Sequence, residues 1–369
     1  MCPINLGMNK ILLVCPALPD DMPYIRQYLD FLESSNTSYD VIYLCSKGAS
    51  KEYPQNYHAC MIKSPDNSYA IKKIWGYYKY SRFVVKRLAK GGYTHVITMG
   101  IACSVFLSNY LRHNYTSRYI YDIRDYSQVL RIPIFKLLNK LLLKYSYMNV
   151  ISSGGFKQWL PSGVDYTLCH NTTLDKIENG VCKTFDVELT GAITILTIGQ
   201  VRDLEANTFV IEQLSNKDDF ELTFSGIGLT LEKLEKLVKD NAYSNVEFTG
   251  KYKKEDEDVI VKNATLLNVC MESNMVSNYL LSNRLYLAAR LKRPLISFDG
   301  SYQANLIQKY NLGLIVKRSD ILSEKIKGYI ASFNPEEFEV GCQKFLDDVK
   351  RDLLIFIGKM NNFIKCQTE

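Results

Sequence analysis

A glycine and an arginine lie close together where an apolar, strand-like run ends at residue 198. The segment reads Gly199-Gln200-Val201-Arg202 and precedes a helical pattern. Glycine lets a phosphate approach the backbone, the amino terminus of a helix favours anions, and an arginine fork pairs with them. We therefore predict that Gly199 and Arg202 bind a phosphate group. An arginine exposed on a turn is the alternative.

Two more glycine turns follow the next two predicted strands. The first spans 225–228 and contains two glycines, and the second is Thr249-Gly250. Because glycine has no side chain, such turns let a nucleotide lie close to the backbone. They are candidate nucleotide contacts, although turns of this kind are common and each is a weak signal.

A short acidic motif ends a strand-like run in the first half of the chain. It reads Asp122-Ile123-Arg124-Asp125. Two carboxylates beside an arginine can fix a hydroxyl group of a substrate. Asp125, Asp122 and Arg124 are therefore the predicted catalytic residues. The alternative is a local ion pair that caps the following helix.

A second arginine lies where a cation is unusual. Arg284 begins the predicted helix 282–291, and the dipole of a helix disfavours positive charge at its amino terminus. A cation at this place is explained if it holds an anion. A solvated surface arginine is the alternative.

The segment around Arg284 alternates between helical and strand-like patterns. Apolar residues at helical spacing run to Pro294, which ends the first helix, and 295–298 is a short apolar strand. Gly313 occupies the place of a C-cap glycine after a second helix, and 314–316 begins another strand. This order predicts parallel strands joined by crossover helices, which bind ligands where strand ends meet helix amino termini.

The same alternation extends through the rest of the chain, and its 369 residues suffice for two domains. The polar stretch 171–191 has no clear period and predicts a linker. We therefore predict an α/β protein with a Rossmann-like domain at 1–170 and a second at 192–369, which ends in a long helix from Pro335. The segment 46–66 is predicted to be a loop.

The segment around Arg284 contains a distinctive set of residues: Arg284, Leu285, Tyr286, Ala288, Ala289, Arg293, Pro294, Leu295 and Ile296. In this order they resemble the donor-binding segment of GT-B glycosyltransferases, in particular those of bacterial capsule and surface-polysaccharide assembly. The resemblance implies two Rossmann-like domains facing across a cleft, with the final helix crossing back onto the N-terminal domain. It also implies that the N-terminal domain binds the acceptor and the C-terminal domain binds a nucleotide-sugar donor.

The resemblance also implies roles for single residues. Arg202 matches the arginine that binds the donor diphosphate, and Asn207 stands where the family often has a lysine. The Asp-x-Arg-Asp motif faces the cleft in the resembling enzymes. The predicted donor-binding residues are Gly199, Arg202, Asn207, Ser225, Gly226, Gly228, Thr249, Gly250, Asn283, Arg284 and Leu285.

Two glutamates of the family are missing. The one that holds the donor's ribose falls at Leu287, and the earlier one falls near Tyr279. These losses leave open a non-catalytic GT-B-like partner subunit of a polysaccharide assembly complex, and they leave retaining or inverting stereochemistry undecided. A GT-B sugar-nucleotide epimerase is a further alternative, but it would need more acidic and histidine residues than the four scattered histidines suggest.

Positive charge is concentrated in the first half of the chain. Residues 1–170 hold 20 Lys and Arg against 10 Asp and Glu, whereas 171–369 hold 25 against 29. Two predicted helices, 69–90 and 132–147, are basic and amphipathic, which is typical of contact with an anionic membrane surface. A solvated face is the alternative for either helix alone. Nucleic acid is a weaker candidate because no recognition motif is present.

The predicted reaction is sugar transfer to a lipid-linked saccharide in capsule, O-antigen or exopolysaccharide assembly, at the cytoplasmic face of the cell membrane. The ten cysteines include no Cys-x-x-Cys pair, which makes a zinc site or a disulfide framework unexpected. We expect no metal and no cofactor apart from the nucleotide-sugar co-substrate, because arginines and helix dipoles can neutralise a leaving diphosphate. No export signal or membrane-spanning run is predicted.

Overall fold

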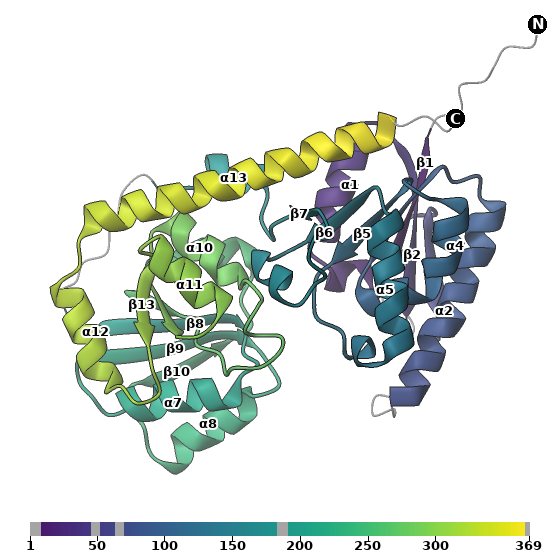
Figure 1. Ribbon diagram of the computed structural model, residues 1–369. Coiled ribbons are helices and arrows are strands. Elements are labelled where there is room, and N and C mark those ends of the chain that lie inside the picture. Colours follow the sequence, from purple (N-terminus) through teal and green to yellow (C-terminus); the bar gives the residue numbers. More distant parts are fainter. Residues whose placement is uncertain (1–8, 46–51, 63–69, 183–190, 366–369) are drawn as a thin grey trace, which may run out of the picture. The chain divides into compact units, whose positions relative to one another are not determined.

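The computed structural model describes residues 9–45, 52–62, 70–182 and 191–365 (Figure 1). The chain divides into two compact units. Unit 1 comprises Met1–Asn171 and Asp352–Glu369, and unit 2 comprises Thr172–Arg351. Each unit is an α/β domain built on a parallel sheet.

Unit 1 contains a seven-stranded parallel sheet in the order β3-β2-β1-β4-β5-β6-β7. Its strands are β1 (Lys10–Cys15), β2 (Ser38–Cys45), β3 (Tyr57–Met61), β4 (His95–Met99), β5 (Tyr119–Ile123), β6 (Met148–Ile151) and β7 (Tyr166–Leu168). Its main helices are α1 (Ile25–Ser34), α2 (Ala70–Lys90), α3 (Ile101–Ser104), α4 (Ser108–Asn114) and α5 (Pro133–Tyr145). Helix α1 covers one face of the sheet, and α2, α4 and α5 cover the other (Figure 1).

Unit 2 contains a six-stranded parallel sheet in the order β10-β9-β8-β11-β12-β13. Its strands are β8 (Ile193–Gln200), β9 (Phe220–Ile227), β10 (Val246–Gly250), β11 (Leu266–Asn268), β12 (Leu295–Phe298) and β13 (Gly313–Val316). Its helices are α6 (Leu174–Asn179), α7 (Leu204–Leu214), α8 (Leu231–Asp240), α9 (Glu257–Lys262), α10 (Asn283–Leu291), α11 (Tyr302–Lys309) and α12 (Leu322–Ala331).

The central strands are buried on both faces, which explains why they read as continuous apolar runs. In β1, Ile11 and Leu13 pack in the cluster formed with α1, and Leu12 and Val14 are also buried. In each sheet the strand order reverses once, between β1 and β4 and between β8 and β11. Parallel sheets bind ligands at the carboxyl ends of the strands beside such a reversal.

The last helix, α13 (Pro335–Lys365), belongs to both units. From Asp352 onward it is part of unit 1, where Phe356, Met360 and Phe363 are buried in the cluster with α1. The predicted return of the final helix to the N-terminal domain is thus confirmed. Two Rossmann-like domains with parallel sheets are confirmed as well.

Two local predictions were wrong. Gly313 is the first residue of β13 and does not cap α11; Asn311, with φ 53°, has the left-handed conformation that follows this helix. A Cβ atom on Gly313 would lie 2.1 Å from the carbonyl oxygen of Leu295, so glycine is needed for close pairing of β12 and β13. The predicted loop 46–66 contains β3, which adds an edge strand beside β2.

Candidate functional site

The residues that could bind phosphate lie at the carboxyl end of β8, beside the reversal of strand order in unit 2. Arg202 follows this strand and is exposed, and its Nε donates to Gln200 Oε1 at 3.3 Å. Asp203 is the N-cap residue of α7, and its carboxylate accepts from the backbone N–H of Ala206 at 3.0 Å. The turn therefore presents a cation at the amino terminus of a helix, as the sequence predicts.

Arg284 reaches the same place from α10. Its Nε donates to the carbonyl oxygen of Ile198 at 2.5 Å, and its Nη2 donates to that of Gln200 at 2.9 Å. Ser282 caps the helix by accepting from the backbone N–H of Arg284 at 3.3 Å. The end of β8 thus fixes the Arg284 guanidinium close to the Arg202 turn.

The two arginines influence each other electrostatically. The pKa of Arg284 is lowered to about 10, mainly by burial; Tyr252 acts to raise it, and the positive charge of Arg202 acts to lower it. Within the described part of the chain, neither guanidinium forms an ion pair with a carboxylate. Two cations held together without a counter-charge are expected to attract an anion with more than one negative charge.

Tyr252 is a neighbour of this site that the sequence analysis did not identify. Its hydroxyl lies 3.8 Å from the place where a Cβ atom on Gly199 would stand, and it donates to Glu257 Oε1 at 2.9 Å. Burial raises the pKa of Tyr252 and the charge of Glu257 raises it further, so the hydroxyl remains a donor. Tyr252 could have been predicted from the sequence, because it lies two residues after Gly250, at the end of β10.

Three predicted donor-binding residues lie in the interior of unit 2. Asn207 is buried on α7, where its side chain donates to the carbonyl of Asp203 and accepts from Asn268 at 3.2 Å. The buried hydroxyl of Ser225 is hydrogen bonded to that of Thr249 at 2.6 Å, and Leu285 is completely buried on α10. We therefore reassign Asn207, Ser225 and Leu285 from ligand contact to the core that supports the site.

The two glycines after β9 are required by strand packing. A Cβ atom on Gly226 would lie 1.9 Å from the carbonyl oxygen of Gly199, and one on Gly228 would lie 1.8 Å from that of Val201. Their lack of a side chain lets this segment lie against β8 and its continuation. Packing accounts for both glycines without a nucleotide.

The remaining predicted donor residues lie at the surface. Thr249 and Gly250 end β10 and are exposed, and Gly250 has a φ of 71° that favours glycine. Asn283 is exposed as the first residue of α10, beside Arg284. Together with the exposed Arg202 and the half-buried Gly199 and Arg284, these residues form the accessible part of the predicted donor site.

The family's two glutamate positions are occupied by residues that cannot replace a carboxylate. Leu287 is buried on α10, and Tyr279 is half-buried in the segment before that helix. A different acidic residue, Glu272, lies after β11 and forms an ion pair with Arg318. Its backbone N–H also donates to Asp203 Oδ2 at 2.6 Å, which ties this loop to the Arg202 turn.

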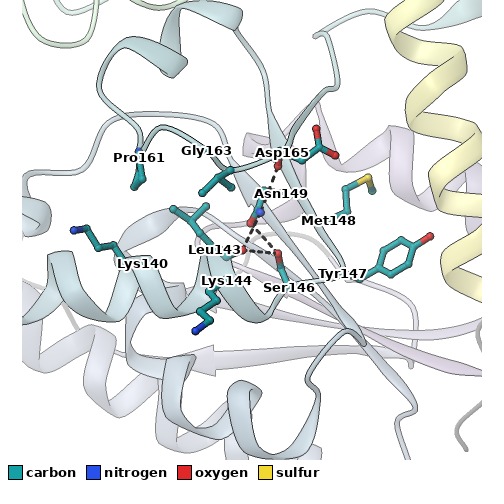
Figure 2. Close-up of a pocket in the computed structure, with 11 residues that line it drawn as sticks. Lys140, Leu143, Lys144, Ser146, Tyr147, Met148, Asn149, Pro161, Gly163 and Asp165 are labelled. Atoms are coloured by element: carbon teal, nitrogen blue, oxygen red, sulfur yellow. Dashed lines mark hydrogen bonds between the residues drawn. The ribbon is translucent and has the colours of Figure 1, made fainter.

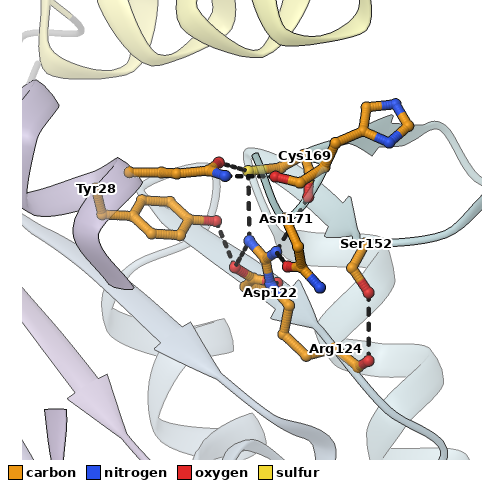
Figure 3. Close-up of polar contacts among 8 residues, drawn as sticks. Tyr28, Asp122, Arg124, Ser152, Cys169 and Asn171 are labelled. Atoms are coloured by element: carbon orange, nitrogen blue, oxygen red, sulfur yellow. Dashed lines mark hydrogen bonds and ion pairs between the residues drawn. The ribbon is translucent and has the colours of Figure 1, made fainter. Parts of the chain in front are cut away.

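In unit 1, the Asp-x-Arg-Asp motif separates into a buried pair, Asp122 and Arg124 (Figure 3), and the exposed Asp125. Asp122 is 0% exposed, and Arg124 grips it with two hydrogen bonds of 2.7 and 2.8 Å. Tyr28 donates its hydroxyl to Asp122 at 2.6 Å. The alternative prediction, a local ion pair, describes Asp122 and Arg124, which we reassign from substrate contact. Asp125 is exposed and remains the catalytic candidate of the motif.

No protein-family model and no curated protein sequence matches this chain. Solved structures do match it. Sucrose-phosphate synthase from Thermosynechococcus elongatus has a TM-score of 0.71 at 14% identity, covering 97% of this chain and 98% of the other. The lipopolysaccharide outer core galactosyltransferase WaaB has a TM-score of 0.64 at 14% identity, with 96% and 99% covered. HepE from Anabaena, in complex with UDP, has a TM-score of 0.64 at 10% identity, with 96% and 100% covered.

The fold is GT-B. Both sheets, the helices around them and the long C-terminal helix are matched over nearly the whole chain. The GT-B part of the sequence resemblance is therefore confirmed. At 10 to 14% identity, these matches establish the fold.

A pocket of about 580 Å³ opens in unit 1 at the amino-terminal ends of β6 and β7 (Figure 2), whereas the Asp-x-Arg-Asp motif lies at the carboxyl end of β5. It lies at the carboxyl end of α5 and the start of β6, and its lining includes Lys140, Lys144 and Asn149. Asn149 donates to the carbonyl oxygen of Leu143 at 3.0 Å, so this amide supports the pocket wall. None of the predicted donor-binding or catalytic residues lines it.

The two predicted basic helices of this GT-B chain expose both lysines and large apolar side chains. On α5, Lys136, Lys140 and Lys144 are exposed, and Ile134 and Leu137 are each 53% exposed. The sequence of α5 contains no acidic residue, and neither does that of α2.

On α2, Trp75 is 57% exposed and stacks on Tyr78 with ring centroids 5.2 Å apart. Lys79 Nζ lies 5.7 Å from the centroid of the Trp75 ring. Among the described residues, no helix is long and apolar enough to cross a membrane, and no group of three or more His, Cys, Asp or Glu is arranged to hold a metal ion.

Proposed function

We propose that the protein is a glycosyltransferase that moves a sugar from a nucleotide-sugar donor to a lipid-linked saccharide acceptor. The observation that carries this proposal is the placement of Arg202 and Arg284 together at the carboxyl end of β8, in a GT-B fold, without a paired carboxylate in the described residues. A nucleoside diphosphate is the leaving group of such a reaction, and its charge suits two guanidinium groups.

In this mechanism the chain itself neutralises the leaving group. Arg284 is held by two carbonyl oxygens of β8, so its guanidinium is oriented before the donor binds. Arg202 is held less tightly, by a hydrogen bond to Gln200, and supplies a second guanidinium group for the diphosphate. Donors oriented in advance stabilise the charge that develops as the bond to the diphosphate breaks. A metal ion is not required for this role.

Asp125 is the proposed base for the acceptor hydroxyl. It follows β5 at the carboxyl end of the sheet of unit 1 and is exposed, whereas Asp122 and Arg124 are buried before it. A carboxylate within reach of the attacking hydroxyl can accept its proton. The buried pair fixes the backbone from which Asp125 projects.

The lipid-linked acceptor is proposed from the charge of unit 1. Helices α2 and α5 carry lysines, exposed apolar side chains and no acidic residues. Such faces suit an anionic membrane surface, where lysines meet head groups and aromatic side chains lie at the interface. Assembly of capsule, O-antigen or exopolysaccharide at the cytoplasmic face of the membrane would place acceptors there.

Two alternatives are weaker. The apolar side chain of Leu287 at the family's glutamate position favours a non-catalytic partner subunit. However, a protein that had lost its catalytic role would be expected to lose the arginines of the donor site as well, and Arg202 and Arg284 are both present. An epimerase is disfavoured because all four histidines precede unit 2. Two of them, His58 and His170, already face Asp40 and Asp352.

The experiment is titration calorimetry with a panel of nucleoside diphosphates, followed by transfer of labelled sugars from nucleotide-sugars to lipid extracts. Arg284→Ala should lower the affinity for the preferred nucleotide about tenfold to 10²-fold, as expected for loss of a charged hydrogen-bond donor. Arg26→Ala is a matched control, because Arg26 forms an exposed pair with Asp30 on α1. Absence of nucleotide binding by the wild-type protein, or equal affinity in Arg284→Ala, would overturn the proposal.

A further inference from the structure

The chain passes between the two units at two places. It leaves unit 1 after Asn171 and returns to it at Asp352 within α13. The residues just before the first passage and just after the second therefore determine how firmly unit 1 holds both connections.

The buried guanidinium of Arg124 is directed at the first passage (Figure 3). Its Nη1 donates to the carbonyl oxygen of Cys169 at 3.0 Å and to Asn171 Oδ1 at 3.1 Å, and its Nη2 donates to Cys169 Sγ at 3.3 Å. The remaining bonds of Arg124 go to Asp122. One buried side chain thus holds Cys169 and Asn171, two of the last three residues of unit 1 before the chain leaves it.

The second passage, at Asp352, also contacts the segment 169–171. His170 Nε2 lies 3.0 Å from Asp352 Oδ2, so the residue between Cys169 and Asn171 contacts the first residue of unit 1 on α13. One turn further along α13, Phe356 packs against Tyr28 with ring centroids 5.5 Å apart. Tyr28 donates its hydroxyl to Asp122, which closes the network.

We infer that Arg124 is a positioning residue that anchors both passages of the chain and so limits how unit 2, with its donor site, moves relative to unit 1. Asp122 neutralises Arg124 in the interior, which lets the guanidinium direct its other donors at 169–171. A buried pair of this kind is costly to break, because the partner left behind is an uncompensated charge. The network is therefore suited to holding one arrangement of the backbone.

Asn171→Ala and Arg124→Lys weaken this anchor without leaving Asp122 unpaired. The alanine removes one acceptor, and the lysine keeps the charge but cannot reproduce the fork of the guanidinium. Arg118→Lys is a matched control, because Arg118 also donates to two backbone carbonyl oxygens in unit 1, those of Thr94 and Asn114, away from 169–171.

The first measurement is the distance distribution between spin labels on the full chain, attached through unnatural amino acids at the exposed positions Gln128 in unit 1 and Lys233 in unit 2. The distribution should broaden in Asn171→Ala and Arg124→Lys and stay unchanged in Arg118→Lys. Distributions that superimpose on the wild type in both anchor variants would overturn the inference. If Arg124→Lys does not fold, Asn171→Ala still decides.

The second measurement rests on the proposed function. Turnover should fall roughly tenfold to 10²-fold in the two anchor variants, as expected when the reacting groups are positioned less precisely. The nucleotide dissociation constant, set within unit 2, should change less than about twofold, a split that simple loss of stability would not produce. A wild-type protein that binds no nucleotide would reject the proposed function, whereas the label distances would still test the anchor.

Discussion

Arg202 and Arg284 lie close enough together for the charge of Arg202 to lower the pKa of Arg284. They come from different elements, the turn after β8 and the first turn of α10, and the carbonyl oxygens of Ile198 and Gln200 hold Arg284 in place. Bringing two cations together is unfavourable unless an anion joins them. The relationship therefore predicts that the pair acts as a unit on one ligand.

Replacing Arg202 with alanine is expected to slow sugar transfer by roughly 10²-fold or more, because the diphosphate gains negative charge in the transition state. Arg202→Lys should restore only part of the rate, since an ammonium group cannot form the bidentate fork. Thermal unfolding should not change, because Arg202 is exposed. The measurement is the steady-state rate of transfer from a nucleotide-sugar to a lipid-linked acceptor. Unchanged transfer and nucleotide affinity in Arg202→Ala would remove this residue from the donor site.

The placement of Arg202 and Arg284 could be predicted from sequence because it depends on local patterns. A strand followed by a glycine turn and a helix brings its polar residues to the carboxyl edge of a parallel sheet, wherever the other strands lie. The two-domain GT-B fold followed from the same alternation of strands and helices, together with the donor-segment resemblance.

The burial of Asn207 and the role of Gly226 could not be predicted in this way. Asn207 lies on the face of α7 that meets Asn268, 61 residues away along the chain. Gly226 is required by contact with Gly199 on the neighbouring strand. Both facts depend on long-range packing, which a local pattern does not contain.

The strand β3 was missed for a related reason. Tyr57–Met61 has an apolar run of only three residues, Ala59 to Met61, and it becomes a strand by pairing with the edge of β2. In the Asp-x-Arg-Asp motif, the sequence identified the chemistry of the three side chains but not their directions. The hydrogen bonds of Arg124 to Cys169 and Asn171 require the fold to bring 169–171 beside the end of β5.

Asp40 is expected to contribute stability that disappears in acid. Its carboxylate accepts from Tyr93 and pairs with Lys10 at 3.1 Å and Arg87 at 3.3 Å. Burial acts to raise the pKa of Asp40, but these partners outweigh it and the pKa is lowered from 3.8. A carboxyl group with a lowered folded-state pKa stabilises the fold above its unfolded-state pKa and loses that contribution as the pH falls through the folded-state pKa.

Asp40→Asn should therefore lower the free energy of unfolding by about 1–3 kcal/mol at pH 7, the range for loss of a hydrogen bond to a charged group. The difference from the wild type should shrink as the pH falls below 3.8. Urea unfolding at pH 7 and near pH 3 measures both values. Asp30→Asn, at an exposed pair on α1, is the control and should have little effect at either pH. An Asp40→Asn deficit that is the same at both pH values would contradict this assignment.

Gly313→Ala is expected to destabilise unit 2. The new Cβ atom would lie 2.1 Å from the carbonyl oxygen of Leu295, and φ at this position is 152°. Because backbone atoms are in the way, the strands must separate, at a cost of roughly 1–3 kcal/mol. Gly358→Ala is the matched control, since a Cβ atom there meets nothing within 4 Å and alanine favours the helix α13. Urea midpoints should fall for Gly313→Ala and rise slightly for Gly358→Ala; equal midpoints would show that β12 and β13 do not need the glycine.

The exposed lysines of α5 predict that the protein binds anionic membranes and that salt weakens this binding. Lys136, Lys140 and Lys144 are exposed on α5, with no acidic residue on that helix. Attraction between exposed charges is screened over about 8–10 Å at physiological ionic strength. The protein should therefore sediment with liposomes that contain anionic lipids and be released by high salt. Liposomes of neutral lipid should retain much less of it.

Replacing the three lysines with glutamate should abolish sedimentation without unfolding the protein, because their side chains are exposed. Each lysine near an anionic surface contributes about 1 kcal/mol, so three together change the partition strongly. The matched control replaces Lys233, Lys236 and Lys239, three exposed lysines on α8 of unit 2, by glutamate, which makes the same change in net charge. This control should still sediment if the charge of α5 matters more than the net charge of the chain. Equal loss in both variants would assign the effect to net charge, and binding that is absent or unaffected by salt would count against the membrane-facing role of α5.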